Sequence, residues 1–168
     1  MSKFEIQSGL PPYGPMAKNF SALGSRTFTE GLVVKFFPST GASWVGNFID
    51  GECGISTVID HPNGKSVIAI SGGLGYIVDP EHQTLLGSIA GCIWHVTKYQ
   101  GENLLIFGDN CGFEAIGESG IVWKTRRIAW DEMRNIRLIG STIYGEAREL
   151  DDSWTPFEVD AKTGQLLK

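Results

Sequence analysis

The stretch Asn103–Thr125, NLLIFGDNCGFEAIGESGIVWKT, decides the fold of this chain. Its apolar runs at Leu104–Phe107, Phe113–Ile116 and Ile121–Thr125 predict three strands. Short polar turns that contain glycine separate these runs, and turns this short join neighbouring antiparallel strands. The stretch therefore predicts an antiparallel meander.

Glycine divides the rest of the chain in the same way. The sequence holds 22 glycines among its 168 residues, and they stand between apolar runs, where they predict turns. Asn63-Gly64 is the strongest hairpin signal, and Cys92–Tyr99 alternates with the period of a strand. Further strands are expected at Leu32–Phe37, Ser43–Ile49, Ile55–Asp60, Ser66–Ser71, Leu74–Asp79, Thr84–Ile89, Ile136–Ile139, Thr142–Glu149, Thr155–Asp160 and Gln165–Leu167.

These signals together predict an all-β protein. We expect an antiparallel meander of about thirteen short strands, arranged as a β-sandwich or a partial propeller-like sheet. One helical turn is expected at Trp130–Asn135, and a bulge or bend is expected near Arg126-Arg127, where the apolar positions change phase. Almost no other helix is predicted.

The length of the chain predicts a single domain over residues 1–168. Residues 1–31 are expected to form an extended Pro/Gly-rich segment that packs on the body, because the prolines of Gly9–Pro15 fix φ and lack an N–H donor. Tyr13 either anchors this segment or is offered to a partner. The anchor is the preferred interpretation, since an ordered surface segment needs a buried side chain.

The charge of the chain excludes one class of partner. A net charge of −5 argues against a nucleic-acid binder, which normally presents a basic face. The one basic cluster is Lys124–Arg127, close to Trp123 and Trp130. It is interpreted as a solvated strand end whose cations pair with nearby acids, the alternative being an anion or partner site.

The sequence favours a cytoplasmic protein. Its start lacks the apolar run of a signal peptide, and no segment approaches the ~18 apolar residues of a membrane span. Cys53, Cys92 and Cys111 form an odd set in apolar or Gly-rich surroundings. The simplest interpretation is three free, buried thiols in a reducing compartment.

Three segments can be superimposed: Gly75–Ser88, Gly112–Thr125 and Pro156–Lys168. Each begins with an aromatic anchor, passes through an acidic or turn residue and ends in a strand rich in leucine or valine. The anchors lie roughly 40 residues apart, which is the spacing of a propeller blade.

The pattern resembles a blade of the quinoprotein-like (PQQ-type) β-propellers. The residues that carry the resemblance are Gly108-Asp109-Asn110 with Phe113-Glu114-Ala115, and Phe157–Gly164. Because the matching residues are structural, the resemblance implies a meander but neither a cofactor nor a catalytic role. The chain as a whole also resembles a group of small bacterial proteins that begin with a Gly-Leu-Pro-Pro-Tyr-Gly-Pro-like segment, which implies no mechanism.

Candidate catalytic and metal-binding groups are sparse. His61, His82 and His95 show no ligand spacing, and no Cys-x-x-Cys occurs, so no metal site or cofactor is predicted. Cys111 lies in a turn, but its neighbours are acidic, which disfavours an activated thiolate. The adjacent carboxylates Asp131-Glu132 and Asp151-Asp152 are typical of turns; the alternative is acid–base catalysis.

Aromatic and acidic residues give the best site hypothesis. Five tryptophans are many for this length, and most are expected to fill core corners. Trp130 and Trp154 stand beside the loop acids Asp131, Asp151 and Asp152. A mixed aromatic and acidic surface suits protein recognition, so these five residues form the predicted partner-binding site.

The predicted function is non-enzymatic protein binding. An immunity- or inhibitor-type protein that neutralises a basic protein is the concrete form, because an acidic surface accelerates association with a basic partner. The alternative is an enzyme or small-molecule-binding protein with a site in a sheet concavity, using carboxylates and His95. A third hypothesis is a homo-oligomer in which exposed strands pair between copies of the chain.

Overall fold

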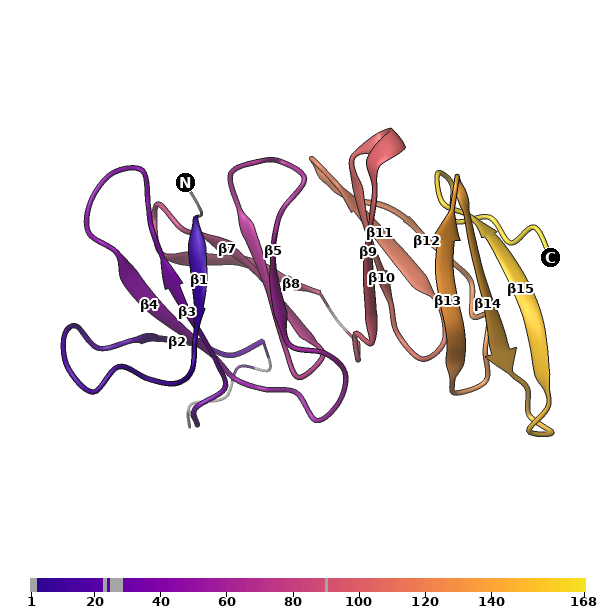
Figure 1. The fold of residues 1–168 in the computed structure, drawn as a ribbon, viewed down its shortest axis with the longest axis horizontal. Coiled ribbons are helices and arrows are strands. Elements are labelled where there is room, and N and C mark those ends of the chain that lie inside the picture. Colours follow the sequence, from indigo (N-terminus) through magenta and orange to yellow (C-terminus); the bar gives the residue numbers. More distant parts are fainter. Residues whose placement is uncertain (1–2, 23, 25–28, 90) are drawn as a thin grey trace. The chain divides into compact units, whose positions relative to one another are not determined.

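The computed structural model describes residues 3–22, 24, 29–89 and 91–168. These residues form fifteen strands in four sheets and one 3-10 turn, Gln100–Glu102, with no α-helix among them (Figure 1). The expected all-β, mostly antiparallel architecture is confirmed. The chain divides into two compact units, Met1–Cys92 and Ile93–Lys168, which are described separately.

The first unit contains two four-stranded sheets. The strands of sheet A, in spatial order, are β1 (Phe4–Gln7), β3 (Leu32–Phe36), β4 (Trp44–Phe48) and β2 (Lys18–Phe20). Sheet B is the meander β5 (Thr57–Asp60), β6 (Val67–Ser71), β7 (Leu74–Asp79) and β8 (Thr84–Ile89). Among the strands that the structure describes, only β2 pairs in parallel, with β4. Residues 1–31 thus supply both edge strands of sheet A, while 1–2, 23 and 25–28 of that segment lie outside the described residues.

The two sheets of the first unit share one apolar core. Alternation along each strand turns Phe36 and Phe48 of sheet A toward Tyr76 and Val78 of sheet B, and all four side chains are fully buried. The Tyr76 hydroxyl donates a hydrogen bond to the Ile49 carbonyl at 2.7 Å. The polar tip of this buried ring is therefore satisfied, which removes the penalty for burying it.

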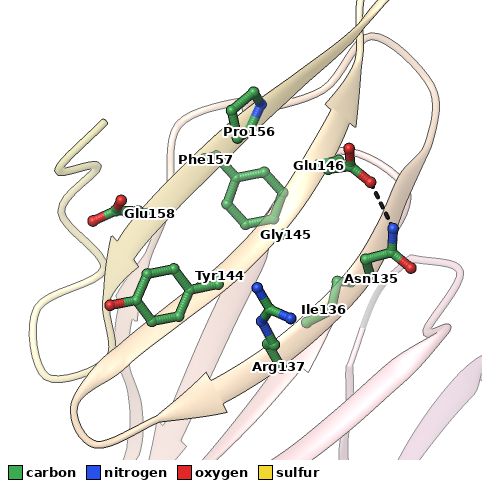
Figure 2. A pocket seen from close by; sticks show the side chains of 9 residues that line it. All are labelled: Asn135, Ile136, Arg137, Tyr144, Gly145, Glu146, Pro156, Phe157 and Glu158. Carbon is green, nitrogen blue, oxygen red and sulfur yellow. Dashed lines mark hydrogen bonds between the residues drawn. The ribbon is translucent and has the colours of Figure 1, made fainter.

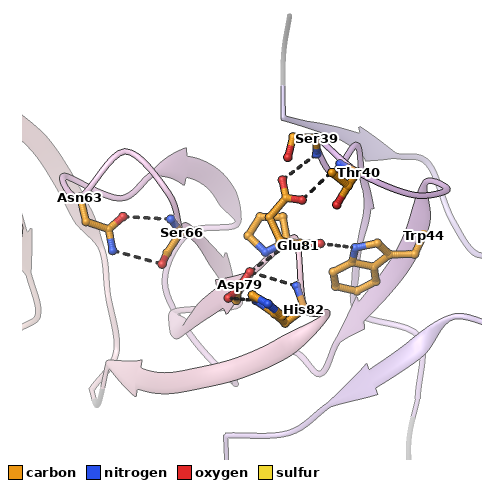
Figure 3. A network of polar contacts seen from close by, with 9 residues as sticks. Ser39, Thr40, Trp44, Asn63, Ser66, Asp79, Glu81 and His82 are labelled. Atoms are coloured by element: carbon orange, nitrogen blue, oxygen red, sulfur yellow. Dashed lines mark hydrogen bonds and ion pairs between the residues drawn. The ribbon is translucent and has the colours of Figure 1, made fainter.

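Polar contacts fasten the β7–β8 turn to sheet A (Figure 3). The Glu81 carboxylate accepts a hydrogen bond from the Ser39 backbone N–H at 2.6 Å. The Trp44 indole N–H donates to the Pro80 carbonyl at 2.8 Å, and this contact is buried. Both contacts join residues far apart in the sequence and fix the turn on the unit.

The same turn holds an exposed ion pair. Asp79 accepts a hydrogen bond from the His82 ring at 2.7 Å, and a second one from the His82 backbone at 3.1 Å. The ring contact with the Asp79 carboxylate raises the pKa of His82 above its usual value.

The second unit contains a four-stranded and a three-stranded sheet. Sheet C is the meander β9 (His95–Tyr99), β10 (Leu104–Gly108), β11 (Phe113–Gly117) and β12 (Gly120–Lys124). Sheet D is formed by β13 (Met133–Ile139), β14 (Thr142–Arg148) and β15 (Trp154–Asp160). The stretch Asn103–Thr125 thus supplies β10, β11 and β12 as expected.

Sheets C and D share the second core. Its centre is the ring pair Phe113 and Phe157, whose centroids lie 5.8 Å apart. The Trp123 indole N–H donates to the Ala161 carbonyl at 3.2 Å, so this buried tryptophan links the two sheets.

Three local expectations are corrected. Trp130–Asn135 is not a helical turn: a bend leads into β13, because pairing with β14 outweighs a single helical turn, which is marginal by itself. The bulge of this region lies at Ala115/Ile116, and Gln165–Leu167 forms an isolated bridge at Leu166 in place of a strand.

The cysteine expectation is also corrected. Cys53 and Cys92 form a disulfide with a Cα–Cα distance of 5.8 Å, while Cys111 is free and half-buried. The two partners are 39 positions apart in the sequence. The fold brings them together, which their spacing alone did not indicate.

Candidate protein-interaction site

The outer face of sheet D carries the candidate site. Along β14 the side chains alternate: Ile143 and Ala147 are buried in the core, whereas Tyr144, Glu146 and Arg148 point to the other face. The register places Tyr144 opposite Glu158 and Arg148 opposite Trp154 of β15. The sheet therefore presents a row of polar and aromatic side chains on a rigid support.

Three carboxylates surround Arg148, and these four residues are called the Arg148 cluster here. The guanidinium lies 2.7 Å from Asp152, 3.6 Å from Glu132 and 3.8 Å from Asp131. The hydrogen bond and charge of Asp152, reinforced by the other two carboxylates, raise the pKa of Arg148. Because three negative charges face one positive charge, the cluster keeps a net negative charge.

A second polar group lies next to the cluster on β13 and β14. Glu146 Oε2 accepts a hydrogen bond from Arg134 Nε at 3.0 Å and one from Asn135 Nδ2 at 2.6 Å. These two hydrogen bonds lower the pKa of Glu146 below its usual value. Arg134 also lies over the Trp154 ring, with its Cζ 3.8 Å from the ring centroid, so the orientation of this indole is fixed by a cation–π contact.

An irregularity in β13 places the amide of Asn135. Pairing with β14 shifts register between Arg134 and Arg137, and Asn135 has a φ of +55°. Asparagine accepts this left-handed conformation more readily than most residues.

A depression of about 530 Å³ lies on this face of sheet D (Figure 2). In the figure, Arg137, Tyr144 and Glu146 stand around it, with Pro156 and Glu158 on the neighbouring strand. Its volume falls within the range of ~300–1,000 Å³ that is usual for small-ligand pockets. The depression is lined by side chains of both charges and lies on the same face of sheet D as the Arg148 cluster.

Trp130 stands at the edge of the same surface. Its backbone N–H donates to the Arg148 carbonyl at 2.8 Å, which continues the pairing beyond the end of β14. Its side chain is 52% exposed and lies under the Arg127 guanidinium, with 5.1 Å between Cζ and the ring centroid. Arg127 further donates hydrogen bonds to the carbonyls of Ala129 and Trp130.

The structure places the five sequence-predicted site residues as follows. Asp131 and Asp152 belong to the Arg148 cluster, Trp154 is half-buried opposite Arg148, and Trp130 is tied to the same strand end. Asp151 lies in the turn before β15, where hydrogen bonds from the Ser153 side chain and backbone lower its pKa.

Sequence reasoning missed the basic residues between these acids. Arg134 and Arg148 organise the surface, and Glu146 links Arg134 to Asn135. The sequence did contain a signal for Glu146 and Arg148, since the alternation in Thr142–Arg148 puts both side chains on one face of the strand.

Of the groups weighed for catalysis, the carboxylates Asp131, Glu132 and Asp152 meet in the Arg148 cluster, whereas His95 lies elsewhere. His95 starts β9 in sheet C; its Nε2 is buried without a hydrogen-bond partner among the described residues, and burial lowers its pKa. His95 does not line the depression on sheet D. Within the described ranges, no group of three or more His, Cys, Asp or Glu is placed to hold a metal ion, and no helix has the length and apolar character needed to cross a membrane.

No protein-family model matches the chain, and no curated protein matches it. Among solved structures, the chain is similar to a eukaryotic initiation factor at 10% identity and a TM-score of 0.45, covering 83% of this chain and 39% of the other. It is also similar to the computationally designed Ika8 protein at 14% identity and a TM-score of 0.48, covering 85% and 46%. The chain thus spans less than half the length of either, and neither similarity carries an argument about function.

Proposed function

We propose that the protein is a non-enzymatic binding protein, and that the outer face of sheet D binds a basic protein partner. The observation that carries this proposal is the Arg148 cluster, in which three carboxylates share one guanidinium between Trp130 and Trp154. The exposed Trp130 and the half-buried Trp154 supply aromatic contact area, and the excess of negative charge attracts a basic surface.

The order of the surface supports this function. Trp154 is held by Arg134, and Asp152 is held by Arg148, so these side chains lose little freedom when a partner binds. Preorganised side chains lower the entropic penalty of association. Tryptophan and arginine are also the residue types that dominate binding energy in interfaces.

An immunity- or inhibitor-type protein is the concrete form of the proposal. Neutralising a basic toxin requires fast capture, and the net charge of −5 favours fast association with a cation-rich partner. A cytoplasmic location stays a prediction, and the Cys53–Cys92 disulfide counts against it, because disulfides are rare in the reducing cytosol. We propose that a single chain binds the partner; pairing of two copies through exposed strand edges is the competing form of association.

The test begins with capture of a partner from host lysate at low and at physiological salt, read by mass spectrometry. The association rate is then compared for the double variant D131N/D152N and the matched control E52Q/E118Q, which changes net charge equally through exposed acids outside this surface. We expect D131N/D152N to slow association and E52Q/E118Q to leave it nearly unchanged.

Trp154 gives the second arm of this test. We expect W154A to accelerate dissociation by about fivefold or more, as loss of an aromatic anchor does. Equal rates for the wild type and both surface variants would reject sheet D as the binding face. Capture of a second copy of this chain, and of no basic protein, would show self-association in place of binding to a basic partner.

The depression beside the cluster favours one alternative, a small-molecule-binding protein. Its lining by Arg137, Tyr144 and Glu158 offers charges of both signs and an aromatic ring. A thermal-shift screen of metabolites tests this alternative. Saturable binding that is lost in R137M, with an unchanged melting temperature of the free protein, would favour the alternative over the protein-binding proposal.

A further inference from the structure

The first unit contains a hollow of about 660 Å³ where loops of sheets A and B meet. It is larger than the depression on sheet D, and its volume is also usual for a small-ligand pocket. Four segments line it: Lys3 before β1, Phe37–Ser39 after β3, Gly64-Lys65 in the β5–β6 turn and Asp79–His82 at the β7–β8 turn. The packing of the two sheets thus creates the hollow from residues that are distant in the sequence.

Lys3 fastens the N-terminal segment at this hollow. Its ammonium donates a hydrogen bond to the Gly64 carbonyl and lies 3.4 Å from Asp60, and its carbonyl accepts one from the Phe37 N–H at 2.8 Å. Tyr13, in contrast, is 89% exposed, so the expectation that it anchors this segment by burial is wrong. The hydrogen bonds of the β7–β8 turn to sheet A hold a second wall (Figure 3). The hollow is therefore formed before a ligand enters, as ligand pockets usually are.

The carboxylates among the described lining residues are already held by donors of the protein. Asp79 accepts hydrogen bonds from the His82 ring and from the backbone N–H groups of Glu81 and His82. Glu81 accepts hydrogen bonds from the backbone N–H groups of Ser39 and Thr40. Neither carboxylate needs a cation from a ligand.

The cations at the hollow are less well satisfied. Lys65 makes neither an ion pair nor a side-chain hydrogen bond with any described residue. Lys35 Nζ lies 5.4 Å from the centroid of the Phe37 ring and also has no carboxylate partner within the described ranges. His82 uses Nδ1 for Asp79, so Nε2 of the protonated ring is left as a donor. The same contact raises the pKa of His82, which favours the protonated ring.

We propose that this hollow binds a small aromatic carboxylate, with its ring against Phe37 and its carboxylate between Lys65 and His82. Phe37 is 38% exposed, and Pro38 and Pro80 add apolar surface beside it, so a flat ring finds contact on this wall. An ammonium and an imidazolium both form charge-assisted hydrogen bonds with a carboxylate. Apolar walls with a few polar groups that orient the ligand are typical of small-molecule sites.

A carboxylate fits the hollow better than a phosphate group does. Asp79 and Glu81 line the same hollow, and their negative charges repel a dianion more strongly than a monoanion. Phosphate is typically bound by the fork of an arginine or by the N-terminus of a helix. Neither an arginine nor a helix is among the described residues that line the hollow.

The experiment titrates the full ¹⁵N-labelled chain at pH 6 with 2-naphthoate and with indole-3-acetate as probes. We expect a dissociation constant of about 1 mM or lower for at least one of them. The amide resonances of sheet D should stay unchanged. The resonances expected to shift are those of Phe37, Ser39, Gly64, Lys65, Glu81 and His82.

Two comparison ligands separate the ring from the charge. The neutral 2-naphthamide keeps the ring and loses the charge, whereas acetate keeps the carboxylate and loses the ring. Each should bind about fivefold or more weakly than the probe, because each makes only part of the contacts.

Lys65 gives the variant that tests the assignment. K65M should weaken binding of the probe by about fivefold or more. Its melting temperature should equal that of the wild type, because this ammonium has no partner among the described residues to lose. K98M is the matched control: it removes an equal charge from an exposed lysine of β9, in the second unit, and should bind the probe as the wild type does.

Four results would overturn the proposal. They are the absence of saturable shifts at the hollow with about 10 mM of either probe, equal affinity for 2-naphthamide, equal affinity for acetate, and equal binding by K65M. Equal affinity for acetate would show a surface contact with anions that involves no ring.

The outcome is independent of the function proposed for sheet D. The hollow belongs to the first unit, and D131N/D152N changes only residues of the second. Loss of one binding activity with the other intact separates the two proposals.

Discussion

Arg148 donates two hydrogen bonds to a single oxygen of Asp152: Nη2 lies 2.7 Å and Nε 3.1 Å from Oδ1. Asp152 has a φ of +65°, so the turn after β14 bends its carboxylate back toward the strand. The pair orders an exposed acidic turn against sheet D. It determines how Asp131, Glu132 and Asp152 are presented to a partner.

The first prediction concerns this pair. R148M should lower the melting temperature at low salt, because it leaves three carboxylates close together without their cation. The difference from the wild type should shrink in about 1 M NaCl, where exposed charges are screened. R126M is the control: it removes an equal charge from an exposed arginine outside the cluster, and its melting temperature should stay near that of the wild type at both salt concentrations.

The second prediction concerns a close approach inside the second core. A Cβ at Gly145 would lie 2.4 Å from Cζ of the buried Phe157 ring. G145A should therefore destabilise the protein by about 1–3 kcal/mol, the usual penalty of overpacking. Urea unfolding measures the effect. G87A is the control, because its new Cβ would lie 4.0 Å from Ile77 Cδ1, an ordinary van der Waals contact. If G87A lost as much unfolding free energy as G145A, this explanation would be contradicted.

The third prediction concerns the disulfide. Cys53 and Cys92 close a loop of about 40 residues, so the variant C53S/C92S should lose about 4 kcal/mol of unfolding free energy. Thiol titration of the unfolded, unreduced wild type should find one free thiol, that of Cys111. C111S should unfold like the wild type. Three reactive thiols in the unreduced protein would show that the bond is absent.

The fourth prediction concerns acid stability. Burial lowers the pKa of His95 below 6.5, so between that value and its folded pKa the unfolded chain binds more protons than the folded one. The stability of the wild type should fall as the pH drops from 6.5 through this window. The stability of H95L should fall less steeply over the same range. Urea unfolding at pH 7 and at lower pH measures the two slopes.

His82 provides the opposite case. Asp79 raises its pKa, so its contribution to stability is present below pH 6.5 and is lost as the pH rises through the folded pKa. H82Q should therefore lose stability faster than the wild type on acidification. Identical slopes for H82Q and H95L would contradict at least one of the two assignments, and comparison with the slope of the wild type identifies which.

The strands were predictable where alternation and turn chemistry agree. Leu74–Asp79 and Thr84–Ile89 match the structure in full, and Leu32–Phe37 differs by one residue. β1 and β2 were missed because Phe4–Gln7 and Lys18–Phe20 are short and flank a proline-rich loop. They form by pairing with β3 and β4, and that pairing is not encoded in their own sequence. That residues 1–168 form a single domain stays a prediction.

The candidate site was predictable in part. Adjacent acids and tryptophans pointed to Trp130, Asp131 and Asp152. Alternation put Arg148 on the outer face of its strand, but no local pattern indicated that it would lie between the acids. Arg148 meets Asp131 only because β14 pairs beside the bend that leads into β13. Contacts of this kind depend on strand register.

The sequence by itself determined the class of fold, because period-two alternation and glycine turns are local properties that specify strands and hairpins. It also determined the net charge and the acidic and aromatic composition of the proposed surface. The tertiary structure alone decided which side chains meet: Cys53 with Cys92, Arg148 with its three carboxylates, and the exposure of Tyr13. These depend on contacts between residues distant in the chain, and such contacts form only when sheets pack and registers are fixed.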